Sequence, residues 1–158
     1  MLVAMKKGVL SITAAALAAL ITASSGAGSG GTVTRGVKAL LDARQEVPAQ
    51  TVKRPAARGV LTGTLVVNGT RGKLVWQLGF TGLSGKAVLA HVHLGQYGKA
   101  GPIGFLLCRP CRAGMHGTTS VPRKVVNAIV NGGAYVDVHT KKNPRGEIRG
   151  QLRMITGA

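Results

Sequence analysis

The feature that most constrains the fold of this chain is an alternation of apolar and other residues with a period of two. In residues 73–80 one face collects Leu74, Trp76, Leu78 and Phe80. Segments 87–93, 134–139 and 147–154 alternate in the same way. Successive side chains point to opposite faces in an extended strand, whereas a helix repeats about every 3.6 residues. The sequence therefore predicts several β-strands, each with one buried face.

A β-hairpin is predicted where the segment Val60–Asn68 is followed by residues 73–80. Val60–Asn68 is rich in Val, Leu and Thr and ends at Asn68-Gly69. This dipeptide favours the tight turns that join antiparallel strands. The two segments should therefore lie side by side with one buried face.

One segment, Val121–Val130, has the pattern of a short helix. Pro122 suits a first helical turn, and Asn131-Gly132-Gly133 suits a helix end. The apolar stripe between them consists of Val125, Val126, Ile129 and Val130. The strands are short, are separated by Gly, Pro and Asn turns, and do not alternate with helices. We therefore predict an all-β fold of antiparallel strands, a sandwich or a barrel, with one short helix.

Residues 1–27 have the order of a secretory signal peptide. Lys6 and Lys7 precede an uncharged apolar run, Gly8–Ala23. At about 16 residues this run is shorter than the roughly 20 that span a bilayer, and small residues follow it. We expect cleavage after Ala27 and localisation outside the cytoplasm, either secreted or in the periplasm or at the cell surface. The alternative is an uncleaved N-terminal anchor.

The rest of the chain is predicted to be one domain. Residues 28–36 are rich in Gly, Ser and Thr and suit a flexible lead, which places the domain at 37–155. No second apolar stretch is long enough to span a membrane, so the mature form is predicted to have no transmembrane segment.

The charge of the chain is strongly positive, with 21 Lys and Arg against 4 Asp and Glu and a net charge of +17. Loss of the signal peptide would remove two lysines and leave about +15. Such a charge attracts polyanions, so we expect contact with an anionic cell-surface polymer or with an extracellular protein. Specific nucleic-acid binding is not predicted, because the basic residues are scattered and aromatic residues make up only 3%.

The two cysteines, Cys108 and Cys111, have C-x-x-C spacing. A redox-active pair of this spacing normally begins a helix, where the dipole lowers a thiol pKa. Here the flanking residues Phe105–Leu107 suit a strand and Arg112–Gly114 a turn. In an oxidising compartment the pair is therefore expected to form a structural disulfide, in preference to redox chemistry or metal ligation.

The histidines offer a candidate metal site. His91 and His93 are two apart on a strand, so their side chains leave the same face. Tyr135, Asp137 and His139 likewise share a face. If the two strands pair, three imidazoles come together, a set that suits copper or zinc. The pattern is similar to the His-x-His strand of copper/zinc superoxide dismutase.

The alternative to metal binding is that the three histidines are structural. In that interpretation they hydrogen-bond to turn backbone and to Asp137 or Glu147, and they fix the loop 95–101. Tyr135, Asp137, Glu147 and Arg149 are the predicted supporting residues. Glu147 and Arg149 are placed on the outward face of their strand, where Glu147 is expected to form a solvated ion pair with Arg149 or Arg145.

The sequence does not predict an enzyme. Its serines and threonines have no His or Asp neighbour at the spacing of a known triad motif, and four acidic residues are too few for a convincing acid/base pair. Dismutase chemistry is disfavoured, because only His116 remains to bind a second metal.

Three blocks of the sequence resemble the CHRD (chordin-domain) family, microbial secreted type. The first, 41–48, ends in Glu-Val-Pro; the second, 90–103, has a His-x-His strand and a loop with Gly-Pro. The third, 133–152, contains Tyr-Val-x-Val-His-Thr, Asn-Pro and Gly-Glu-Ile-Arg-Gly-Gln. The resemblance implies an immunoglobulin-like β-sandwich of the Greek-key type, found in microbial secreted proteins and in an animal growth-factor antagonist, without an established enzymatic activity. The extreme basicity and the segment around Cys108 and Cys111 depart from the family pattern.

Two functional hypotheses follow. The first is a secreted binding or structural module without catalytic activity, which contacts an extracellular partner or an anionic polymer. The second is a copper or zinc binding protein that uses His91, His93 and His139 at one end of the domain.

Overall fold

The computed structural model describes residues 31–49 and 56–155, which form nine strands, one 3-10 helix and one α-helix. In chain order the elements are β1 (Val33–Asp42), η1 (Ala43–Gln45), β2 (Arg58–Asn68), β3 (Arg71–Thr81), β4 (Ala87–Leu94), β5 (Ile103–Cys108), β6 (Met115–Val121), α1 (Arg123–Val130), β7 (Ala134–Thr140), β8 (Ile148–Gln151) and β9 (Arg153–Ile155).

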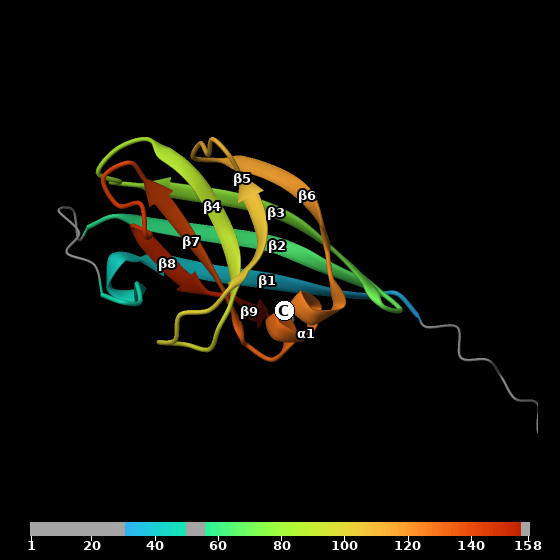
Figure 1. Ribbon diagram of the computed structural model, residues 1–158. Coiled ribbons are helices and arrows are strands. Elements are labelled where there is room, and N and C mark those ends of the chain that lie inside the picture. Colours follow the sequence, from blue (N-terminus) through green and yellow to red (C-terminus); the bar gives the residue numbers. More distant parts are fainter. Residues whose placement is uncertain (1–30, 50–55, 156–158) are drawn as a thin grey trace, which may run out of the picture.

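The strands form one antiparallel sheet with the order β5-β4-β7-β8-β1-β2-β3-β6, and β9 pairs with β1. The sheet bends round on itself into a nearly barrel-shaped body. In Figure 1 β5, β4, β7 and β8 cross in front of β1, β2 and β3, and α1 lies at one end. The predicted all-β antiparallel fold with one short helix is confirmed, while the immunoglobulin-like arrangement stays a prediction.

The predicted hairpin is β2–β3, whose ladder runs up to the pair Asn68 and Arg71. Gly69 in the turn has a φ of 57°, in the left-handed region that glycine adopts at little cost. Leu74, Trp76 and Leu78 are buried, as the alternation predicted. The Trp76 indole donates a hydrogen bond of 3.0 Å to Thr119 Oγ1 on β6.

The helix begins at Arg123, two residues later than predicted, because Val121 is the last residue of β6. Pro122 takes the N-cap position. Val125, Val126 and Ile129 of the predicted stripe are buried, but Val130 is 52% exposed. Val126 packs directly over Gly72, where a Cβ atom would collide with it.

Part of the segment that the sequence assigns to a flexible lead is a strand in the structure. β1 begins at Val33 and pairs with β2 from that residue on, so the last four residues assigned to a lead belong to the sheet. The predicted signal peptide, with its cleavage site after Ala27, lies outside the described residues. Within the described ranges no helix has the length and apolar character needed to cross a membrane.

Strands β7 and β8 are buried on both faces. All seven residues of β7 and all four of β8 are buried, although alternate side chains point away from the apolar core. Glu147 and Arg149, predicted to be solvated, are 0% and 2% exposed. That prediction was wrong, because alternation indicates the face of a strand and does not show whether loops cover that face.

Candidate metal centre

The predicted pairing of the two histidine strands is present. β4 and β7 are antiparallel neighbours, with His91 opposite Asp137 and Leu89 opposite His139. Residues directly opposite each other in a ladder project from the same face, and so do residues two apart on one strand. The register therefore brings His91, His93, Asp137 and His139 together on the face turned away from the apolar core.

The four side chains converge on one point. One donor atom from each of them lies within 4.8 Å of all the others. His93 Nε2 is 3.1 Å from Asp137 Oδ2, and His139 Nε2 is 3.0 Å from Asp137 Oδ1. His91 Nδ1 lies farther out, 4.0 Å from Asp137 Oδ1. The side chains are 5–15% exposed, so the cluster is nearly closed to solvent.

Two of the histidines are oriented by backbone carbonyls. His93 Nδ1 lies 2.9 Å from the carbonyl oxygen of Gly101, and His139 Nδ1 lies 3.0 Å from that of Pro144. In the neutral imidazole, an Nδ1 that donates its proton to a carbonyl leaves Nε2 with a free lone pair. Metal-binding histidines are commonly held in this way. The structural role foreseen as the alternative is thus present, and it leaves the inner nitrogens available as ligands.

The inner donor atoms have no hydrogen bond of normal geometry in the described part of the chain, although Nε2 of His93 and Nε2 of His139 form close ion pairs with Asp137. These atoms are His91 Nδ1, Nε2 of His93 and His139, and Asp137 Oδ1, and all of them are buried. A buried polar atom without a partner costs about 1–3 kcal/mol. A cation at the centre would satisfy all four atoms together.

The electrostatics keep the carboxylate charged. Burial raises the pKa of Asp137, but the close His139 and His93 outweigh it and lower the pKa to about 2. Burial lowers the pKa of both of those histidines, and Asp137 outweighs it and raises their pKa. For His91 burial prevails and lowers the pKa. Asp137 is therefore an anion at neutral pH, ready to bind a cation.

Comparison with known proteins identifies the family. The family model for the CHRD domain matches residues 37–152. The chain belongs to the CHRD family. The match covers most of the chain and confirms the family resemblance of its sequence blocks. No curated protein and no solved structure matches the chain.

Tyr135 and Arg149, two of the predicted supporting residues, lie beside the histidine cluster of this CHRD domain. The Tyr135 ring stacks on His93 with the centroids 4.9 Å apart, and the Arg149 guanidinium lies 3.4 Å from the Tyr135 ring centroid. Arg149 also donates to the carbonyls of Gln96 and Lys99, at 3.3 and 2.8 Å. It thereby ties down the loop that carries Gly101, the hydrogen-bond partner of His93.

Glu147 is not one of the residues of the candidate metal centre. Its carboxylate accepts hydrogen bonds from the backbone and hydroxyl of Ser84, from Thr140 Oγ1 and from Asn143 Nδ2. These bonds lower its pKa in spite of burial, which acts in the opposite direction. Neither predicted ion pair is present, because Arg149 points to the 95–101 loop. Glu147 instead connects the β3–β4 loop to the turn after β7.

Glu46 is a buried acid within electrostatic reach of the centre, and sequence reasoning missed it. It is 5% exposed, and burial, followed by the charge of Asp137, raises its pKa to about 8. Its carboxyl group lies against Gly146, where a Cβ atom would be 2.6 Å from its oxygens. Gly146 has a φ of 121° and leaves room for the acid. Two signals were available, the rarity of acidic residues in this chain and the place of Glu46 in the Glu-Val-Pro motif of the first family block.

The substitution Glu46→Gln is expected to reduce the loss of stability with rising pH. Folded Glu46 keeps its proton up to about pH 8, whereas the unfolded chain releases it near 4.5. Between these values the folded state binds more protons, so the parent loses stability as pH rises, on the order of 2–4 kcal/mol. Denaturant unfolding with chelator present measures the free energy of unfolding at about pH 5 and at pH 8. This free energy should fall less between the two pH values in the variant than in the parent. Equal falls in both proteins would contradict this assignment.

The other candidate residues lie away from the centre. The Sγ atoms of Cys108 and Cys111 are 2.05 Å apart, at disulfide distance as predicted. His116 lies exposed on β6, opposite Gln77 of β3, and does not join the other three histidines.

Proposed function

We propose that this CHRD domain binds one divalent transition-metal ion, copper in the first place and zinc as the alternative, at His91, His93, Asp137 and His139. The observation that carries the proposal is the convergence of four buried donor atoms that have no hydrogen bond of normal geometry within the described residues. Tyr135, Arg149 and the carbonyls of Gly101 and Pro144 would hold the imidazoles in place.

The donor set favours copper and zinc over other common ions. Imidazole nitrogen suits both, whereas calcium and magnesium prefer all-oxygen sites. Copper(II) binds a given nitrogen and oxygen site more tightly than zinc does. The ionised Asp137 would supply one negative charge to the bound cation.

We further propose that the domain acts by binding outside the cytoplasm and not by catalysis. The order of residues 1–27 supports export, and CHRD domains occur in extracellular proteins. His116 lies on β6, away from the other three histidines, and this supports a single metal site and argues against a two-metal dismutase.

Metal titration of the purified protein, first stripped with chelator, tests the proposal. Copper(II) should bind saturably at one ion per chain, zinc more weakly, and calcium not at all. Free copper at about 100 times its Kd should stabilise the fold by about 2.7 kcal/mol, seen as a higher Tm. Absence of saturable copper and zinc binding would overturn the proposal.

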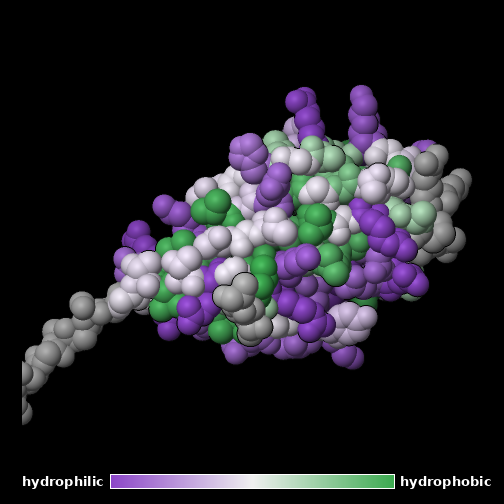
Figure 2. Space-filling model, turned by 180° about the vertical axis from the view of Figure 1, so that it is seen from behind, coloured by the Kyte–Doolittle hydropathy of each residue, from purple (hydrophilic) through white to green (hydrophobic). Residues whose placement is uncertain are grey.

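Attachment to an anionic cell-surface polymer is a second candidate function. Three of the four acidic residues, Glu46, Asp137 and Glu147, are buried, so the surface charge is almost wholly basic. On the face shown in Figure 2, hydrophilic side chains are distributed over much of the surface with apolar patches between them. This distribution favours diffuse attraction over a shaped binding site for one polymer.

Binding to an anionic polymer is therefore expected to depend strongly on salt. Screening shortens the range of surface charges from about 30 Å at 0.01 M salt to about 8 Å at 0.15 M. In co-sedimentation with insoluble anionic wall material, most of the bound protein should be released over this range. Retention that does not change with salt would contradict attachment by charge.

A further inference from the structure

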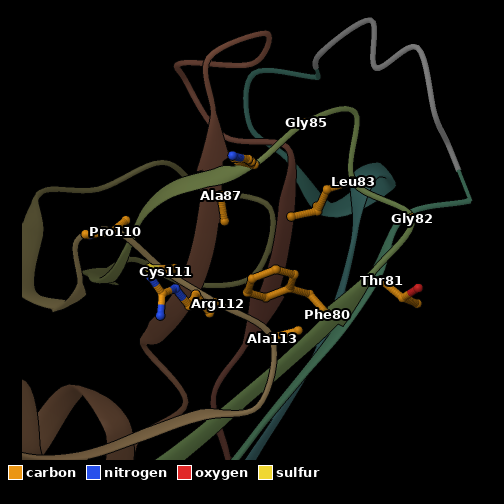
Figure 3. Close-up of a pocket in the computed structure, with 11 residues that line it drawn as sticks. Phe80, Thr81, Gly82, Leu83, Gly85, Ala87, Pro110, Cys111, Arg112 and Ala113 are labelled. Atoms are coloured by element: carbon orange, nitrogen blue, oxygen red, sulfur yellow. The ribbon is translucent and has the colours of Figure 1, made fainter.

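A second concave site lies where the β3–β4 and β5–β6 connections meet. It is a cavity of about 660 Å³, open to solvent, and Figure 3 shows the residues that line it. They come from the end of β3, from residues 82–87 and from residues 110–113. None of the four proposed metal ligands is among them. The volume lies within the range of about 300–1,000 Å³ typical of small-molecule sites.

The inner wall of this cavity is apolar. Phe80 and Leu83 face Ala87 and Cys111 across it, and Ala113 lies below the Phe80 ring (Figure 3). Ala87 and Cys111 are 5% exposed and belong to the apolar core of the domain. The cavity therefore opens onto the core, at the mouth between the two layers of the sheet. An apolar ligand group placed there would be removed from water.

The rim of the cavity is cationic. Lys86 and Arg112 are both exposed and are the only charged residues among those that line it in the described chain. Ser84, in the loop that lines the cavity, donates hydrogen bonds to the Glu147 carboxylate. This carboxylate is buried and therefore does not face the cavity as an exposed charge. A ligand in the cavity would thus meet two positive charges and no exposed negative charge.

We propose that this cavity binds a small anionic amphiphile, an apolar body that carries one carboxylate. The apolar part would lie against Phe80, Leu83 and Ala87, and the carboxylate would face Lys86 and Arg112. The mouth of a β-barrel is a common position for such a site. This binding is independent of the metal centre, which lies on the opposite face of β4. A register shift between Ala87 and Leu89 turns Ala87 toward the apolar core, whereas His91 and His93 point away from it.

Titration with alkyl carboxylates, followed by NMR shifts of backbone amides, tests the site. Hexanoate, octanoate and decanoate should shift residues 80–87 and 110–113, and affinity should rise up to about fourfold for each methylene buried. Decyltrimethylammonium has a chain of the same length and the opposite charge, and it should bind at least about tenfold more weakly than decanoate.

A pair of matched variants distinguishes binding through the two rim cations from attraction by the general positive charge of the protein. Lys86→Gln/Arg112→Gln should weaken decanoate binding about five- to tenfold, because it removes both rim cations. Lys73→Gln/Lys124→Gln removes the same charge from exposed positions outside the cavity and should leave the affinity within about twofold. Equal affinities of the two variants would overturn the proposal. So would equal binding of the cationic amphiphile, or amide shifts confined to other parts of the sheet.

Discussion

Replacing His91 and His93 together by alanine is expected to abolish saturable copper binding. The double variant removes two of three imidazoles and leaves only His139 and Asp137 at the centre. Loss of a partner outside the ligand shell already costs about 10- to 100-fold in metal affinity, so loss of two ligands should exceed 100-fold. Isothermal titration with copper(II) measures the change directly.

The single variant His91→Ala distinguishes an effect on metal binding from an effect on the stability of the fold. No hydrogen bond of His91 is present within the described residues, whereas His93 also bonds the carbonyl of Gly101. His91→Ala should therefore weaken copper binding while it changes the free energy of unfolding in chelator by less than about 1 kcal/mol. His116→Ala, an exposed histidine on β6, serves as the control and should bind copper as the parent does. A double variant that binds as tightly as this control would exclude the site.

Replacing Glu147 by alanine is expected to destabilise the fold by about 3–5 kcal/mol. The carboxylate is 0% exposed and accepts hydrogen bonds of 2.7, 2.6 and 2.9 Å from Ser84, Thr140 and Asn143. Removing it leaves the buried donors without an acceptor and opens a cavity. Equilibrium unfolding in denaturant, with chelator present, measures the loss.

Asp42→Ala is the comparison for Glu147→Ala. Asp42 is partly exposed and accepts a hydrogen bond of 2.8 Å from the backbone of Arg44 at the start of η1. Loss of such a cap costs about 1 kcal/mol. If Glu147→Ala costs no more than Asp42→Ala, the buried network does not hold the loops together. If Glu147→Ala costs more than Asp42→Ala, it should also weaken copper binding, because the turn after β7 carries Pro144, whose carbonyl orients His139.

Local patterns predicted the parts of the fold that depend on neighbouring residues. The alternation in residues 73–80 placed Leu74, Trp76 and Leu78 inside, and Asn68-Gly69 marked the β2–β3 turn. β6 has no such alternation, since its sequence is mostly Thr, Ser and Gly, and it went unpredicted. Its place as an edge strand follows from its ladder with β3.

The candidate site was predictable only in part. The spacing of His91 and His93 and that of Asp137 and His139 defined two half-sites, because residues two apart on a strand share a face. Whether the two half-sites lie together depended on a ladder between segments more than 40 residues apart in the sequence. Glu46 reaches the same place from the loop after β1, and no local pattern connects it to the histidines.

By itself the sequence determined several of the strand segments, the β2–β3 turn, the faces of the histidines and the CHRD family. Only the tertiary structure decided that the outward faces of β7 and β8 are buried, that Glu147 bonds Ser84 and not Arg149, and that Glu46 is buried where the charge of Asp137 acts on it. The physical reason is that alternation of apolar and polar residues indicates only the face of its own strand from which a side chain points. Burial and partners depend on the loops that fold over that strand from distant parts of the chain.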